Sequence, residues 1–97
     1  MKKRARRIDG NQNEIVDSLR KIPGVSVAVT SMIGNGFVDI VVGYKGINYL
    51  FEIKDPAQPP SKRGLTPDES DFHKGWCGQI SVVEKLDEIL KIMALTK

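Results

Sequence analysis

Two short apolar runs, residues 37–42 (FVDIVV) and 48–54 (NYLFEIK), constrain the fold of this chain most strongly. They are rich in β-branched and aromatic residues and are joined by a short segment that contains glycine, a pattern that predicts an antiparallel β-hairpin. Charged residues interrupt both runs: Asp39 in the first, and Glu52 and Lys54 in the second. Charged side chains are costly to bury unless they are paired or bind a metal. We therefore expect Asp39, Glu52 and Lys54 to have a specific role.

The register of the hairpin decides whether the three charged side chains meet. Alternate residues of a strand point to opposite faces, so Glu52 and Lys54 share a face. A two-residue turn at residues 44 and 45 would place Asp39 opposite Leu50, and a four-residue loop would place Asp39 opposite Glu52. Both registers bring the carboxylates of Asp39 and Glu52 close together, whereas a three-residue loop would put them on opposite faces.

The other segments predict a single mixed α/β domain. Helices are expected over residues 11–22 and 84–95 and from residue 66, with further strands at residues 25–30 and 79–83. The proline-rich segment 55–64 is expected to be a mobile loop. The order α-β-β-β-α-β-α indicates a mixed sheet with flanking helices, in which the last strand pairs parallel to an earlier one. We assign residues 1–8 to a basic N-terminal tail and residues 9–97 to one domain.

Local signals indicate where two helices begin. Asn11 followed by Glu14 resembles a capping box, and Thr66, Pro67 and Glu69 form a clearer one with Thr66 as the N-cap. Helical spacing also predicts which apolar side chains of the first and last helices face the core: Ile15, Val16, Leu19 and Ile22, and Leu86, Ile89, Leu90 and Met93.

Charge and cysteine content restrict the class of protein. The net charge is +3 and the pI about 9.1, which makes a nucleic-acid partner plausible. Much of this excess lies in MKKRARR, either a solvated tail or a phosphate-binding arm, whose basic residues are Lys2, Lys3, Arg4, Arg6 and Arg7. The chain has no signal-peptide pattern and no apolar run near the ~18 residues of a membrane span, so we expect no membrane contact. A single cysteine, Cys77, excludes an internal disulfide and a multi-cysteine zinc site, and it fits a reducing compartment.

Two adjacent carboxylates followed by a lysine favour metal-dependent chemistry. Neighbouring carboxylates raise each other's pKa, and a divalent cation removes their repulsion. Mg²⁺ prefers one or two carboxylates together with water and phosphate oxygens. A lysine beside such a cation can orient or deprotonate the attacking water, or neutralise developing charge. In a basic protein, Asp39, Glu52 and Lys54 therefore suggest phosphodiester hydrolysis. The alternative is an exposed cross-strand ion pair, which is common for an acid-x-lysine pattern.

A run of motifs extends over nearly the whole chain. In order they are glycine-x-glycine-x-x-aspartate, glutamate-x-lysine, and a leucine and turn that open the next helix: Gly34, Gly36 and Asp39; Glu52 and Lys54; Leu65 and Thr66. From about residue 9 to about residue 90, this combination resembles the virus-type replication-repair nuclease (VRR-NUC) domain of the PD-(D/E)XK nuclease superfamily, in its stand-alone phage form. Two positions depart from the pattern: Val38 replaces the proline that names the superfamily, and Glu69 replaces a frequent glutamine.

The resemblance implies a restriction-endonuclease-like core and a set of site residues. Asp39 and Glu52 would bind Mg²⁺, with Mn²⁺ as a substitute, and the backbone carbonyl of Ile53 would be a further ligand. Lys54 would position or activate the attacking water. In the family an acid on the first helix often completes the site, and Glu14 matches it, although Glu14 also has the alternative role of a helix cap.

The activity implied by the resemblance is cleavage of branched DNA. Small stand-alone members resemble Holliday-junction resolvases that act as homodimers, and two-fold symmetry would pair two sites for symmetric cuts. Such a protein would work in the cytoplasm of a bacterial host. The basic tail would grip the DNA backbone together with Lys62 and Arg63, whose alternative is ordinary surface charge. Two alternative functions are also consistent with the sequence: a nuclease for DNA ends, nicks or duplex sites, and a non-catalytic DNA-binding protein.

Overall fold

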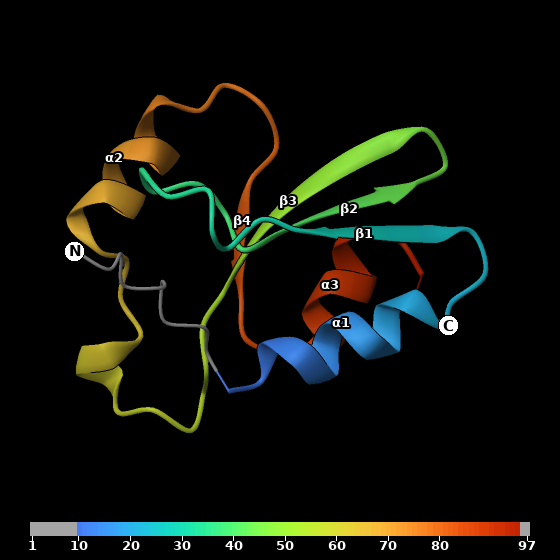
Figure 1. Cartoon of the computed structure of the whole chain (residues 1–97), viewed down its shortest axis with the longest axis horizontal. Helices are drawn as coiled ribbons and strands as arrows, with labels where there is room; N and C mark the ends of the chain where they lie inside the picture. Colours follow the sequence, from blue (N-terminus) through green and yellow to red (C-terminus); the bar gives the residue numbers. More distant parts are fainter. Residues whose placement is uncertain (1–9, 96–97) are drawn as a thin grey trace.

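The computed structural model describes residues 10–95, and the predicted basic tail with Lys2, Lys3, Arg4, Arg6 and Arg7 lies outside the described residues. Within this range the elements follow the predicted order, with one short 3₁₀ helix added (Figure 1). They are α1 (Gln12–Arg20), β1 (Val25–Val29), β2 (Ile40–Tyr44), β3 (Ile47–Ile53), η1 (Pro60–Lys62), α2 (Pro67–Gly75), β4 (Ser81–Val83) and α3 (Leu86–Ile92).

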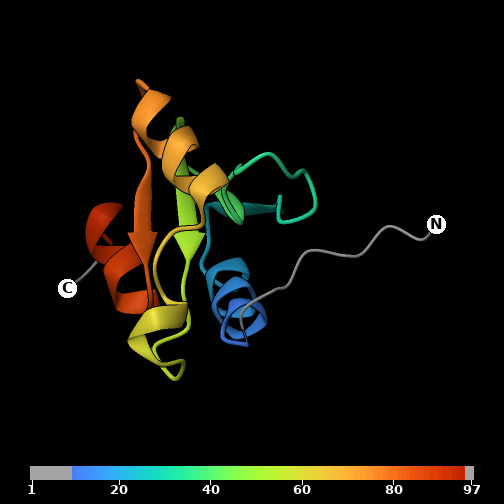
Figure 2. The ribbon, with the colours of Figure 1, turned by 90° about the vertical axis from the view of Figure 1, so that its left-hand side faces the viewer.

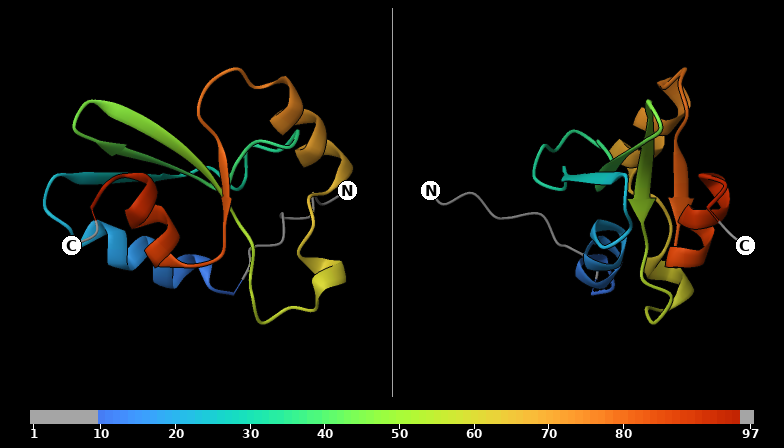
Figure 3. Two further views of the ribbon diagram at one scale, coloured as in Figure 1. Left: turned by 180° about the vertical axis from the view of Figure 1, so that it is seen from behind. Right: turned by 90° about the vertical axis from the view of Figure 1, so that its right-hand side faces the viewer.

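The four strands form one mixed sheet in the order β1-β2-β3-β4. β1 pairs with β2 and β2 pairs with β3 in antiparallel fashion, whereas β4 lies parallel to β3. The predicted parallel pairing of the last strand is therefore confirmed. Helices α1 and α3 contact each other and cover the same face of the sheet, as the view from behind shows (Figure 3).

The hydrophobic core lies between this helix pair and the sheet. α1 and α3 contribute the apolar residues that their helical spacing predicts, and the sheet contributes side chains from β2, β3 and β4. The buried members are Ile15, Val16, Leu19, Ile40, Val42, Phe51, Ile53, Val83, Ile89 and Met93, with Ile22, Leu86 and Leu90 packed at the edge. The predicted inward faces of the first and last helices are confirmed.

A tight turn at Lys45 and Gly46 sets the register of the β2–β3 hairpin. Both residues have positive φ, 53° and 80°, as a two-residue hairpin turn requires. The pairing runs from Tyr44 opposite Ile47 to Ile40 opposite Phe51, where the ladder ends. Asp39 lies one residue beyond it and donates its backbone N–H to the Phe51 carbonyl at 3.1 Å. The ladder has the register that was predicted to bring the two acids together, although its loop has two residues where four were expected for that register. Neither the register with Leu50 opposite Asp39 nor the opposite-face register occurs.

The two predicted capping boxes have different outcomes. At α2 the box is confirmed, because the Glu69 N–H donates to Thr66 Oγ1 at 3.2 Å and the Thr66 N–H donates to Glu69 Oε1 at 3.0 Å. At α1 the prediction is wrong: Asn11 is the N-cap residue but its side chain makes no cap hydrogen bond. Its amide instead donates to the carbonyls of Lys54 and Glu84, at 3.1 and 2.9 Å, and so links the ends of β3 and β4 to α1.

The segment after β3 is a series of hydrogen-bonded turns that includes η1, which the sequence did not predict. The Gln58 N–H donates to the Asp55 carbonyl at 3.0 Å, and the Lys62 N–H donates to the Pro59 carbonyl at 2.8 Å. α2 follows and lies away from the α1–α3 pair, at the opposite end of the sheet from the hairpin turn (Figure 1). Seen from that end, α2 lies above and η1 below (Figure 2).

Candidate functional site

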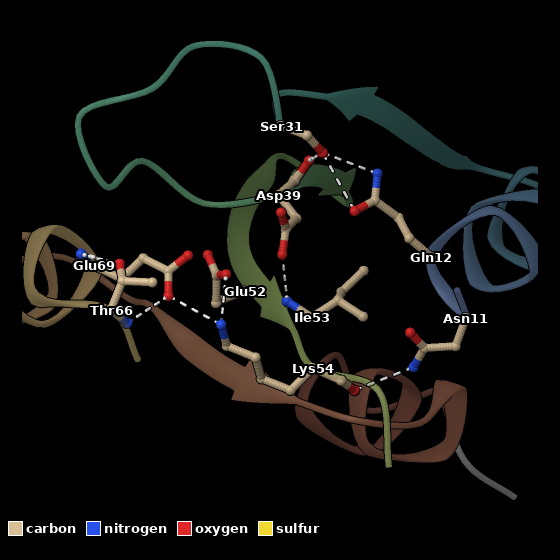
Figure 4. A network of polar contacts seen from close by, with 9 residues as sticks. All are labelled: Asn11, Gln12, Ser31, Asp39, Glu52, Ile53, Lys54, Thr66 and Glu69. Atoms are coloured by element: carbon tan, nitrogen blue, oxygen red, sulfur yellow. Dashed lines mark hydrogen bonds and ion pairs between the residues drawn. The ribbon is translucent and has the colours of Figure 1, made fainter. Parts of the chain in front are cut away.

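A cavity of about 480 Å³ brings together residues from the ends of β2 and β3, from the loop that contains η1 and from the start of α2. Its lining includes charged residues and polar residues: Asp39, Glu52, Lys54, Lys62 and Glu69, and Gln58, Ser61 and Thr66. Asp39, Glu52 and Lys54 thus share one cavity, as the strand alternation and the register predict (Figure 4).

Four of the charged residues that line the cavity are buried. The exposed fractions are 4% for Asp39, 1% for Glu52, 8% for Lys54 and 4% for Glu69. An exposed cross-strand ion pair, the alternative to a functional site, does not describe this arrangement. Burial of three carboxyl groups around a single ammonium group is costly, which makes the cluster an unusual choice for stability alone.

Lys54 lies between two of the carboxyl groups. Its Nζ is 2.9 Å from Glu69 Oε1 and 3.6 Å from Glu52 Oε2 (Figure 4). Glu69 Oε1 also accepts the capping hydrogen bond from Thr66, so a single oxygen holds both the helix start and the lysine. Sequence reasoning assigned Glu69 to the cap alone. Its position at a site where the VRR-NUC pattern often has glutamine was the signal for a second role.

Asp39 is oriented by the strand that carries Glu52. The Ile53 N–H donates to Asp39 Oδ2 at 2.8 Å. Because the N–H and C=O of a strand residue point to the same edge, the Ile53 carbonyl is directed to the side on which Asp39 lies. Ile53 was expected to contribute this carbonyl to a metal site, and its backbone direction is compatible with that role.

A buried polar network supports Asp39 from the other side. Ser31 Oγ accepts a hydrogen bond from the side-chain amide nitrogen of Gln12 at 2.9 Å (Figure 4). Its single hydroxyl proton has two acceptors within reach, the Asp39 carbonyl at 3.4 Å and Gln12 Oε1 at 3.2 Å. Gln12 and Ser31 are only 1% and 0% exposed. Through these contacts the first turn of α1 helps to fix the position of Asp39.

Glu14 lies elsewhere. Its side chain is exposed and lines a separate cavity of about 460 Å³ with Asn11, Asp55 and Lys85. The structure does not bring Glu14 together with Asp39 and Glu52. α1 contributes an amide, Gln12, to the surroundings of Asp39 where an acid was expected.

Burial and the neighbouring charges of Asp39 and Glu69 raise the pKa of Glu52 to about 9, although the Lys54 ammonium opposes this shift. The carboxyl group of Glu52 is therefore held in its protonated form at neutral pH when no other cation is near. Glu69 behaves differently: burial alone would raise its pKa, but hydrogen bonds from Thr66 and Lys54 outweigh burial and hold the pKa of Glu69 below its ordinary value. The two glutamates on either side of Lys54 thus differ in charge.

The two basic residues of the η1 loop have different environments. Lys62 lines the cavity and is exposed. Arg63 Nη1 lies 3.4 Å from Glu84 Oε2, at the end of β4. Only Lys62 of the predicted pair therefore faces the cavity.

A close approach of the β1–β2 connection fixes the start of α2. Gly36 has a φ of 81°, and a Cβ built there would overlap the carbonyl oxygen of Asp68. Next to it the Phe37 ring packs edge-on against Phe72, with ring centroids 5.3 Å apart. These contacts hold the turn that carries Glu69 against the cavity.

The carboxyl groups of the cavity can bind a hard cation only together with other oxygen ligands. Within residues 10–95, no three or more His, Cys, Asp or Glu side chains are grouped so that they could hold a metal ion by themselves. Asp39 and Glu52 provide two carboxylates, which leaves the remaining positions to backbone, water or substrate oxygens. Mg²⁺ favours this kind of coordination, so the residues present fit that ion.

Known proteins give no further information on this site, because no protein-family model, curated sequence or solved structure matches the chain. No helix of the described residues has both the length and the apolar character needed to cross a membrane.

Proposed function

We propose that the protein is a metal-dependent DNA endonuclease of the VRR-NUC type, with its active site in the cavity that contains Asp39, Glu52 and Lys54. The observation that carries this proposal is that Asp39 and Glu52, both buried, line the same polar cavity. A pair of buried acids in which one has a pKa of about 9 is expected where a divalent cation binds, because the cation stabilises the ionised form of both.

Each residue would have a defined role. Asp39, oriented by the Ile53 N–H, and Glu52 would hold the cation, and the Ile53 carbonyl would complete the protein part of the coordination. A bound Mg²⁺ would supply Lewis-acid stabilisation of the phosphodiester oxygens. Lys54, held by Glu69, would donate a hydrogen bond to the attacking water or to a phosphate oxygen, and its positive charge would stabilise the negative charge that develops there.

The substrate and the assembly are proposed on the resemblance. Branched DNA, with a four-way junction as the best candidate, and a homodimer with two sites are the properties of the small stand-alone nucleases that this sequence resembles. A homodimer would place two cavities on one DNA molecule, which symmetric cutting of a junction requires.

The test is a cleavage assay with a labelled four-way junction and a matched linear duplex, in Mg²⁺, Mn²⁺ or EDTA. We expect paired nicks in the junction, dependent on metal. Glu52→Gln should lower the rate at least 100-fold, within the range for loss of a catalytic group. Glu14→Gln is the matched control, because it makes the same change at an acid outside the cavity, and it should retain cleavage.

The other outcomes are equally informative. Cutting of both DNAs would keep the nuclease and remove the junction preference. Binding without cutting under every condition, or an active and folded Glu52→Gln protein, would remove the proposed mechanism and favour a non-catalytic DNA-binding protein. Loss of activity in Glu14→Gln would show that Glu14 reaches the site in the complex with DNA.

A further inference from the structure

We propose that Lys62 and Ser61 form a seat for a second DNA phosphate, next to the one that is cut, and that Arg63 is not part of this seat but anchors the loop that carries it. The inference rests on the proposed function and adds to it how the substrate is held. It assigns different roles to Lys62 and Arg63, two adjacent basic residues for which the sequence predicts the same role.

The residues that line the cavity come from parts of the chain with different chemistry. Asp39, Glu52 and Glu69 make the wall of the proposed metal site acidic. The lining residues that the η1 loop contributes include the hydrogen-bond donors Gln58, Ser61 and Lys62 and no carboxylate. Serine hydroxyls, amides and lysines are among the groups that contact phosphate oxygens in protein–DNA complexes.

Lys62 is available to a ligand. Its side chain is exposed and makes no hydrogen bond or ion pair with the described part of the chain. Lys54, the other cation of the cavity, is buried and already held between Glu52 and Glu69. An incoming backbone phosphate would therefore find its accessible positive charge at Lys62.

Backbone hydrogen bonds and prolines restrict the conformation of the loop that carries these residues. The Lys62 N–H donates to the Pro59 carbonyl, which closes the η1 turn, and the prolines restrict the backbone around it. A preorganised loop loses less conformational entropy on binding than a flexible one does.

Arg63 holds this loop to the sheet. Its guanidinium forms an ion pair with Glu84, whose backbone carbonyl accepts a hydrogen bond from Asn11. The side chains of Arg63 and Glu84 are 29% and 34% exposed, so their pairing fixes the loop against the end of β4 at the protein surface. Through this ion pair Arg63 fixes the position of the neighbouring residue, Lys62.

The test compares Lys62→Gln, Arg63→Gln and Lys74→Gln in binding to a fluorescent four-way junction in EDTA, over a series of salt concentrations. Lys74→Gln is the matched control, because Lys74 is an exposed lysine of α2 outside the cavity. We expect Lys62→Gln to reduce affinity about fivefold to tenfold and to lower the salt slope by about 1, as for loss of one phosphate contact. Lys74→Gln and Arg63→Gln should leave the slope unchanged, and Arg63→Gln should lower the melting temperature.

Equal slopes for Lys62→Gln and Lys74→Gln, or a reduced slope for Arg63→Gln with an unchanged melting temperature, would overturn the inference. The test does not depend on cleavage. A wild-type protein that never cuts DNA but loses one phosphate contact in Lys62→Gln would refute the nuclease and keep the seat. A nuclease whose binding and KM are indifferent to Lys62→Gln would keep the function and refute the seat.

Discussion

The carboxylate of Asp39 accepts a hydrogen bond from the backbone N–H of Ile53 at 2.8 Å. The residue that orients the first acid is therefore the neighbour of the second, Glu52, and of Lys54. A movement of the end of β3 would displace all of these groups together. The hydrogen bond also means that Asp39 can be changed to asparagine without removal of an acceptor for Ile53.

Asp39→Asn should fold normally and lose its response to Mg²⁺. For the wild-type protein we expect Mg²⁺ at about 10 to 100 times its Kd to add about 1.4–2.7 kcal/mol to the free energy of unfolding. That gain corresponds to a rise of about 6–20 °C in the melting temperature of a domain of this size. Asp39→Asn should show no rise, while Glu14→Gln should behave like the wild type. A full Mg²⁺ response in Asp39→Asn would rule out this carboxylate as a ligand.

The metal-free protein should become less stable as the pH rises from 7 to 9. Because the pKa of Glu52 is raised from 4.5 to about 9 in the folded state, the folded state binds more protons than the unfolded state over this interval. Stability then falls with pH, by up to about 1.4 kcal/mol per pH unit for one proton. The lowered pKa values of Glu69 and His73 act below pH 4.5 and 6.5, outside the interval.

Urea unfolding in EDTA at pH 7, 8 and 9 measures this effect. Glu52→Gln carries no charge at any of these pH values, so its stability should be nearly constant where that of the wild type falls. Parallel curves for the two proteins would mean that Glu52 is ionised in the metal-free fold.

Lys54 and Glu69 should be energetically coupled. Lys54→Met leaves buried carboxylates without their ammonium partner and should cost about 3 kcal/mol. Glu69→Gln keeps a residue that can close the capping box but removes one of those charges. In the double variant the cost of Lys54→Met should fall by about 1–3 kcal/mol.

The same cycle with Lys74→Met in place of Lys54→Met provides the control. Lys74 is exposed on the surface of α2, and its coupling to Glu69→Gln should be close to zero. Additive effects of Lys54→Met and Glu69→Gln in chemical denaturation would contradict the 2.9 Å contact between these residues.

Gly36→Ala should destabilise the protein more than Gly34→Ala does. Both glycines have positive φ, 81° and 84°, so each alanine costs about 1–2 kcal/mol for the backbone conformation. At Gly36 the new methyl group also meets the Asp68 carbonyl, which adds about 1–3 kcal/mol, whereas nothing lies within 4 Å of a Cβ at Gly34. Thermal unfolding of the two variants measures the difference, and equal losses would show that α2 can move away from Gly36 at no cost.

Strand alternation and local capping signals were sufficient to predict much of this fold. They placed Glu52 and Lys54 on one face, limited Asp39 to a few registers and located the start of α2 at Thr66. They could not choose among those registers, because the choice depends on the turn conformation at Lys45 and Gly46, which places Tyr44 opposite Ile47.

Long-range contacts account for what the sequence did not reveal. Asn11 looks like an ordinary cap residue, but its amide has better partners at Lys54 and Glu84, which are 43 and 73 residues away in the chain. Glu69 was explained by local capping, and its contact with Lys54 arises only when α2 folds over the end of β3. Tertiary contacts of this kind override local preferences and leave no periodic trace in the sequence.

The turn at Lys45 and Gly46 affects which mutations the protein tolerates, although it lies far from the cavity. Five residue pairs, or about 17 Å of strand, separate this turn from Asp39 and Glu52. A survey of random mutants should therefore find the turn tolerant of many substitutions at Lys45 but intolerant of single-residue insertions and deletions. An insertion or deletion of one residue in the turn shifts the register of the hairpin by one residue. Such a shift would turn the side chain of Asp39 to the opposite face of the sheet from Glu52.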